Sequence, residues 1–258
     1  MSTQQIKNLP FWETIGRSFK YALKNKTLLK SVLPIIVILL ILQMIMNNPF
    51  VCVFQKNACT TDWRYYVTLA SFVMAAVIII INYCRTIVCK VDIDYKSIQF
   101  WKRATYYLLA KMGMLFIISV PSLLSVLLIV YISEVTNVLW ISIILLIPLF
   151  FCIIFAPLFL LFPAVSVEDF NLLKIRKLFQ LAKGNHNAIF WSQLIISMPY
   201  WILFRACMEI YQVVGLSNYI INSVFVLIGI VISVIDSCFK GAYFAHLYQF
   251  FKFYDTEK

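Results

Sequence analysis

The sequence predicts an all-α integral membrane protein with six transmembrane helices arranged as three hairpins. Of its 258 residues, 62% are hydrophobic and 13% are charged, whereas soluble domains are roughly 45–50% apolar and about 25% charged. A soluble protein of this composition would expose apolar patches large enough to cause aggregation. Long uncharged apolar runs alternate with polar segments, and the basic residues gather in every second polar segment. These observations predict the six spans and their topology.

The sequence contains six apolar runs, and each predicts a transmembrane span. The first follows Lys30 and lacks a small-residue cleavage site, so we expect an uncleaved first span and no signal peptide. Only residues 134–137 separate the third run from the fourth, so these two must be antiparallel. The predicted spans are 31–46, 65–84, 112–133, 138–163, 188–204 and 218–237.

Three prolines mark the fourth predicted span as irregular. Each proline lacks a backbone donor and can kink or interrupt a helix. We therefore expect this span to be bent or broken at Pro148, Pro157 or Pro163.

A basic amphipathic segment precedes each predicted hairpin. Apolar residues recur there at intervals of three and four, which indicates one face of a helix. We expect three helices that lie along the cytoplasmic membrane surface. Similar short runs, 21–25, 108–112 and 180–184, end the three segments and suggest a duplicated unit. Such repeats also occur in transporters, so that alternative stays open. The residues at this spacing are Trp12, Ile15, Phe19 and Ala22; Ile98, Trp101, Thr105, Leu108 and Met112; and Leu172, Ile175, Phe179 and Ala182.

The third surface segment, residues 161–187, has the clearest predicted ends. Ser166, three residues before Asp169, fits a capping box at the start of a helix, and Gly184 fits its end. Its basic residues are candidate contacts for anionic lipid headgroups or for a protein partner. These candidates are Lys174, Arg176, Lys177 and Lys183.

The distribution of basic residues predicts the topology. The segments before span one, between spans two and three, between spans four and five, and after span six hold 6, 6, 4 and 3 Lys or Arg residues. The three opposite loops hold 2, 0 and 1. Basic residues collect on the cytoplasmic side, so both termini should be cytoplasmic. The net charge of +11 has the same explanation, and with no nucleic-acid-binding module we expect no nucleic acid partner.

Catalytic motifs are missing from the sequence. No phosphate-binding glycine loop, zinc-ligand motif or nucleophile elbow occurs. The two histidines, His186 and His246, flank spans and are interpreted as polar residues at headgroup level. We therefore predict a protein that is not an enzyme and has no cofactor and no metal.

Charged residues inside or beside the spans are the strongest candidates for function, because a charge in the membrane is costly unless it is compensated. Asp236 can pair with Lys240 one turn on or with Arg85 across the bundle, and a role in ion or proton binding is the alternative. Arg205 and Glu209 have the spacing of an ion pair at the outer end of span five. Interhelical hydrogen bonds are expected for the amides Gln43, Asn82 and Gln193.

Two cysteines share the long loop after the first span. Cys52 and Cys59 would form a disulfide if that side of the membrane is oxidising. The other five cysteines lie in or beside spans, where a free thiol behaves as a small apolar group.

A few short runs in the second half of the chain carry a resemblance to a known family. These are 161–165 (LFPAV), Glu168, Asp169, 181–185 (LAKGN) and 241–248 (GAYFAHLY). In these residues the chain is similar to bacterial YciC-like membrane proteins and, more distantly, to the membrane domain attached to some glycerophosphodiester phosphodiesterases. The resemblance implies a polytopic helical fold in the bacterial cytoplasmic (inner) membrane, and it brings no catalytic residue with it. The phosphodiesterase catalytic domain has no counterpart here, so its activity is not implied.

From these observations we expect a non-enzymatic membrane protein that acts in envelope or lipid organisation, or as a membrane partner, through its basic cytoplasmic surface. Membrane lipids with anionic headgroups are the expected partners, and a protein partner or a homo-oligomer remains open. The alternative is a small-molecule or lipid transporter whose proline-broken helices surround a cavity.

Overall fold

The described residues are almost all helical. They contain no strand, which confirms the all-α class. The computed structural model describes residues 8–24, 26–45, 63–90, 95, 97–133, 149–167, 175–214 and 219–256.

Four of the described helices are long and apolar enough to cross a membrane, which confirms that the chain is a membrane protein. A shorter apolar stretch, Ser31–Gln43, lies in the first predicted span, and Ala156–Val167 overlaps the fourth. The four candidate spans are Tyr66–Cys89, Ile98–Pro121, His186–Tyr211 and Val224–Phe251.

The chain divides into two units. The first unit contains residues 1–11, 94–193 and 247–258, and the second contains 12–93 and 194–246. Both α9 (His186–Val214) and α10 (Tyr219–Thr256) pass from one unit to the other.

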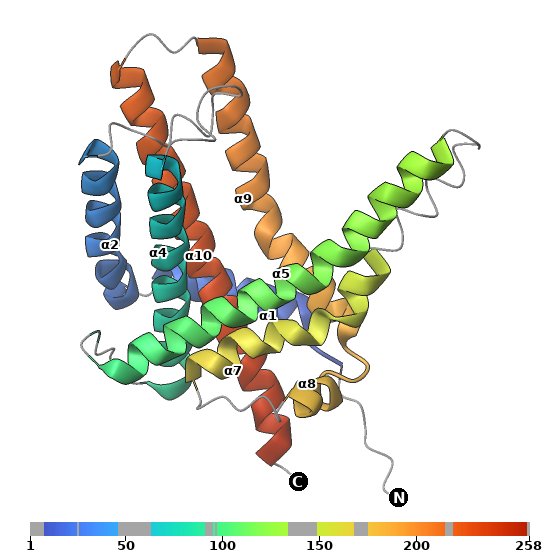
Figure 1. Cartoon of the computed structure of the whole chain (residues 1–258). Helices are drawn as coiled ribbons and strands as arrows, with labels where there is room; N and C mark the ends of the chain where they lie inside the picture. Colours follow the sequence, from blue (N-terminus) through green and yellow to red (C-terminus); the bar gives the residue numbers. More distant parts are fainter. Residues whose placement is uncertain are drawn as a thin grey trace, which may run out of the picture. The chain divides into compact units, whose positions relative to one another are not determined.

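In the second unit, α2 (Lys26–Ile45) packs against α4 (Trp63–Cys89), as Figure 1 shows. The two helices are joined by a hydrogen bond in which Asn82 Nδ2 donates to Ser31 Oγ at 2.9 Å. This bond confirms the interhelical role predicted for Asn82. Two buried residues, Thr68 and Ala75, lie at seven-residue steps before Asn82 and so share its side of α4.

The close contact between α4 and α10 depends on a glycine. A Cβ atom placed on Gly241 would lie 2.7 Å from Cβ of Tyr83 and 3.2 Å from Cα of Ile80. The thiol of Cys84 lies 3.5 Å from the carbonyl oxygen of Gly241. A side chain at position 241 would therefore force the two helices apart.

The first surface helix, α1 (Phe11–Lys24), uses its apolar stripe to contact protein. Ile15 and Ala22 are buried, and the Phe19 ring lies 4.4 Å from that of Phe239, centroid to centroid. The sequence predicts that this stripe faces the bilayer surface. Instead, it is occupied by contacts within the second unit. The exception is Trp12, which is 73% exposed.

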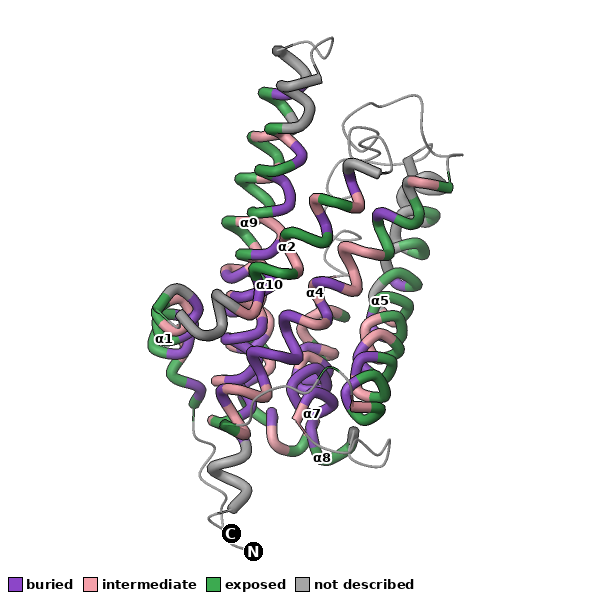
Figure 2. Tube along the Cα trace, turned by 90° about the vertical axis from the view of Figure 1, so that its left-hand side faces the viewer, coloured by how far each residue is buried: buried purple, intermediate pink, exposed green. Residues whose placement is uncertain are grey.

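In the first unit, the third predicted span is part of a longer helix. α5 (Ile98–Ser133) runs for 36 residues without interruption, or about 54 Å at 1.5 Å per residue. The predicted surface helix before Met112 and the span after it are therefore one continuous helix, with no break between them. Apolar side chains continue across that point, so nothing in the local sequence ends the helix. Exposed residues gather along one side of α5 (Figure 2).

The fourth predicted span is broken, as its prolines predict. A turn at Phe155 is followed by the 3-10 helix η1 (Ala156–Leu160), with Pro157 in its first turn, and then by α7 (Leu161–Val167). Pro148 lies outside the described residues.

The short helix α7 runs back along the first half of α5 (Figure 1). The rings of Tyr107 and Phe162 meet there, with centroids 5.0 Å apart. The predicted capping box at Ser166 is wrong, because Ser166 lies inside α7 and its hydroxyl donates to the carbonyl oxygen of Phe162 at 2.7 Å. Since Asp169 is outside the described residues, only the serine half of the motif can be assessed.

The third surface segment contains the short helix α8 (Ile175–Leu181). Its predicted end is confirmed, because Gly184 adopts a left-handed conformation with φ of 84°. The next residue, Asn185, is buried, and its side-chain oxygen accepts a hydrogen bond from the backbone N–H of Leu9 at 2.7 Å. This bond holds the segment before α1 against the turn between α8 and α9.

Candidate functional site: an intramembrane ion pair and a basic helix face

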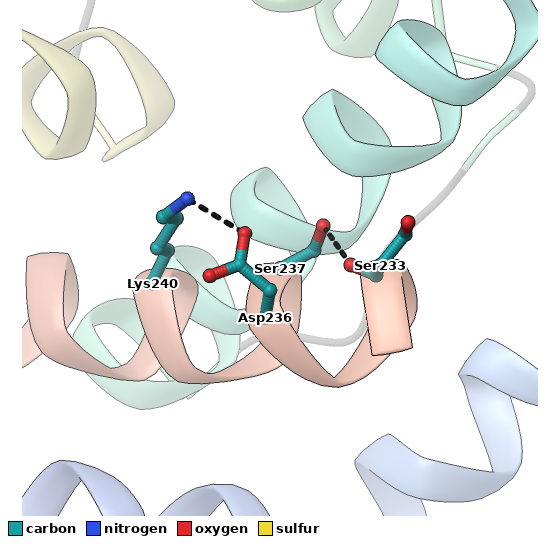
Figure 3. A network of polar contacts seen from close by, with 4 residues as sticks. All are labelled: Ser233, Asp236, Ser237 and Lys240. Atoms are coloured by element: carbon teal, nitrogen blue, oxygen red, sulfur yellow. Dashed lines mark hydrogen bonds and ion pairs between the residues drawn. The ribbon is translucent and has the colours of Figure 1, made fainter. Parts of the chain in front are cut away.

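The ion pair Asp236–Lys240 is the most buried pair of charges among the described residues. It lies in the second unit, inside the candidate span Val224–Phe251. One carboxylate oxygen of Asp236 is 2.6 Å from Nζ of Lys240, and the two side chains are only 11% and 23% exposed. Figure 3 shows both on the same side of α10, one helical turn apart. The pairing with Lys240 predicted from the sequence is confirmed.

Residues on two helices surround this pair. The Tyr200 ring, on the part of α9 that belongs to the second unit, lies 5.6 Å from Nζ of Lys240. One turn before Asp236 and Ser237 on α10, the Ser233 carbonyl oxygen accepts a hydrogen bond from Ser237 Oγ at 2.9 Å (Figure 3). An ammonium over an aromatic face gains further stabilisation when it is desolvated. The arrangement places one positive and one negative charge together, so the ion pair itself has no net charge.

A second ion pair joins Arg205 to Glu209 on α9, as predicted. Both side chains are largely exposed, at 75% and 52%. The pair lies in the last two turns of the candidate span that ends at Tyr211.

The other predicted site is the basic face of α8, a name that here includes the turn at residues 182–184 directly after the helix. Arg176, Lys177 and Lys183 are exposed as expected, while Leu178 and Ala182 are buried. The Phe179 ring contacts that of Phe155, at 6.5 Å between centroids, so the apolar face of α8 packs on η1 and its neighbours. The fourth candidate contact, Lys174, lies outside the described residues.

Sequence reasoning missed one unusual side chain, Arg103 on α5. It is half-buried, and its Nε and Nη1 atoms are buried without a hydrogen-bond acceptor in the described part of the chain. A signal was present in the sequence, because Arg103 lies between Phe100 and Tyr107 on the helical spacing of the buried stripe. Counting Arg103 only as a basic residue of its segment does not reveal that it lies on the buried stripe.

Two of the predicted interhelical amide bonds are not seen. Gln43 is 1% exposed, and neither its amide nitrogen nor its oxygen has a partner among the described residues. The side-chain oxygen of Gln193 also has none there. The described residues therefore do not supply the interhelical bond predicted for Gln43.

Metal-binding and disulfide chemistry can be assessed only for the described residues. No group of three or more His, Cys, Asp or Glu residues among them could hold a metal ion. Five cysteines in that part of the chain are not in disulfides. Cys52 and Cys59 lie outside the described residues, so their disulfide stays a prediction.

No family model, curated protein or solved structure matches this chain.

Proposed function

We propose that this chain is a non-enzymatic multi-pass membrane protein that binds anionic lipid headgroups through the basic face of α8 and acts in envelope or lipid organisation. The observation that carries the proposal is the division of α8 and the turn that follows it into a buried apolar face and an exposed basic face. Leu178 and Ala182 are buried, while Arg176, Lys177 and Lys183 are exposed. Because the apolar face is occupied by protein, α8 would meet the membrane through its charges, each contributing about 1 kcal/mol near an anionic surface.

The topology completes the proposal. We propose six spans in three hairpins, both termini in the cytoplasm, and a location in the bacterial inner membrane. The count of basic residues supports this topology, because 19 of 22 would lie on one side. Membership of the YciC-like family is proposed on the same footing, from the residues that carry the resemblance.

The test measures how much phosphatidylglycerol the purified protein retains in a maltoside detergent, at low and high salt. We expect the triple variant Arg176→Gln, Lys177→Gln, Lys183→Gln to retain less than the native chain at low salt, with the difference lost at high salt. A matched control, Arg176→Lys, Lys177→Arg, Lys183→Arg, keeps the charges and should retain the native amount. Equal retention by all three proteins would rule the proposal out.

A second candidate function is transport of a small molecule or lipid. It is supported by the ion pair Asp236–Lys240 inside a candidate span and by the interrupted helix at Phe155 and Pro157, both of which occur in transporters. In this proposal Asp236 would couple transport to ion movement. Flux into proteoliposomes that is the same for native protein and for Asp236→Asn would argue against that role.

A further inference from the structure

We propose that Arg103 forms a binding site for one phosphate group at the end of α5 nearest its first residue. The site is separate from the basic face of α8 and does not depend on the function proposed for it. The argument rests on what surrounds the guanidinium group.

The neighbours of Arg103 on α5 are buried. Phe100 is fully buried, Ala104 is 1% exposed and Tyr107 is 3% exposed, and these residues precede or follow Arg103 by three, one and four positions. The guanidinium group therefore lies along the side of α5 that is packed, and Lys102, its neighbour, lies on the exposed side.

The contact with α7 closes a further part of the site. Tyr107 and Phe162 are in contact, and α7 runs in the opposite direction to this part of α5 (Figure 1). Arg103 lies one turn before Tyr107 on α5, and Ser166 lies one turn after Phe162 on α7. Because the two helices are antiparallel here, Arg103 and Ser166 lie at the same level. Ser166 is fully buried, and its hydroxyl donates a hydrogen bond to the carbonyl oxygen of Phe162 in its own helix.

The donors of Arg103 lack acceptors. Its Nε and Nη1 atoms are buried and make no hydrogen bond within the described part of the chain. A guanidinium group carries five N–H donors and keeps its charge, so leaving buried donors without an acceptor is costly. An anion with several oxygens would satisfy them, and the fork of arginine matches phosphate well.

Charge and position both favour an anion from outside the chain. No acidic side chain is described in the first unit, whereas the exposed cations Lys102, Arg176, Lys177 and Lys183 are. Arg103 is the sixth residue of the candidate span Ile98–Pro121, about 8 Å from its start along the helix. That depth corresponds to the headgroup region if this end of α5 meets the bilayer surface. A phospholipid and a free phosphate ion share the required chemistry.

The test uses delipidated protein in maltoside, a detergent without phosphate. Native mass spectrometry and thermal unfolding are measured with phosphatidylglycerol, with inorganic phosphate, or with diacylglycerol, which lacks phosphate. We expect one tightly bound phosphatidylglycerol, a rise in Tm with it, and no effect of diacylglycerol. A rise with inorganic phosphate alone would assign the site to the free ion.

Three variants decide the outcome. Arg103→Gln should bind the phosphate group about tenfold more weakly or worse, and Arg103→Lys should be intermediate because it keeps the charge and loses the fork. The control Lys102→Gln should bind like the native chain. Without lipid, Arg103→Gln should be at least as stable as the native protein, because the donors that lack acceptors are gone.

Two results would overturn the proposal. One is equal phosphate binding by Arg103→Gln and the native chain. The other is a loss of stability in lipid-free Arg103→Gln that is reproduced by Glu168→Gln, Asp169→Gln, which would assign the partner of Arg103 to those carboxylates. Both results are distinct from failure of the α8 proposal, which concerns salt-sensitive retention of many lipids.

Discussion

Two ion pairs in the second unit have the same spacing along a helix and very different surroundings. Asp236 and Lys240 are 11% and 23% exposed, whereas Arg205 and Glu209 are 75% and 52% exposed. The order of the charges also differs, because the acid comes first on α10 and the base comes first on α9. An acid that precedes a base by four residues is the more favourable order in a helix.

This difference shows that an ion pair spaced by four residues does not make a fixed contribution to the free energy of unfolding. In an exposed pair, water or lipid headgroups solvate each charge when the other is lost. In a packed pair, a charge that loses its partner stays in a poorly solvated place, and the penalty is much larger.

Two glycines also differ in their surroundings. A Cβ atom placed on Gly241 would touch Tyr83, whereas one placed on Gly113 would have no atom within 4 Å. The effect of a substitution therefore depends on what packs around the residue.

The largest expected effect is that of Lys240→Met. Removing the ammonium group leaves the Asp236 carboxylate without the cation 2.6 Å away, so we expect a loss of about 3 kcal/mol in the free energy of unfolding. Unfolding in mixed maltoside and dodecyl sulfate micelles, followed by far-UV circular dichroism, measures it. A loss no larger than that of Arg205→Gln would remove the distinction between the two pairs.

Gly241→Ala should have the next largest effect. The new methyl group would lie 2.7 Å from Cβ of Tyr83, and overpacking of this kind costs about 1–3 kcal/mol. Gly113→Ala is the matched control, since open space surrounds it, and it should be neutral or stabilising by up to about 1 kcal/mol. Equal effects of the two substitutions in the same unfolding assay would contradict the close approach of α4 and α10.

The double variant Asp236→Leu, Lys240→Met should cost less than Lys240→Met alone. Removing both charges avoids an uncompensated one, and apolar side chains pack well in their place, so we expect a loss below about 1 kcal/mol. The free energy of unfolding of the double and both single variants completes the cycle. A double variant as unstable as the worse single variant would mean that the pair has a further role beyond mutual compensation.

The smallest effect is expected for Arg205→Gln. An exposed pair with the base first contributes at most about 0.5 kcal/mol. The unfolding midpoint should shift slightly at low salt and not at all at high salt, because salt screens exposed charges. A shift that persists at high salt would indicate that this pair is packed more tightly than its exposure suggests.

Local patterns in the sequence predicted what depends on local physics. The helical class, the pairing of Asp236 with Lys240, the interruption near Pro157 and the left-handed turn at Gly184 after α8 all follow from spacing, hydropathy or backbone conformation. The limits of α5, α9 and α10 did not follow, because hydropathy marks where a membrane could lie and not where a helix stops.

The missed features depend on neighbours distant in the sequence. The stripe of α1 looked suited to a bilayer, yet it meets Phe239 and Tyr83. Amphipathic spacing alone does not distinguish an apolar protein surface from lipid. For the same reason Arg103 was counted as a surface charge, since its burial arises from packing around α5 and not from its own hydropathy.

The interrupted segment before α7 has one further consequence. Where a helix stops and restarts, backbone groups lose their regular partners, and hydrocarbon offers no replacement for them. The residues at this point, Ala156, Pro157 and Leu158, are buried in protein. At membrane depth such a segment has to be shielded from acyl chains, so the side of the first unit that covers η1 would act as a seal against lipid.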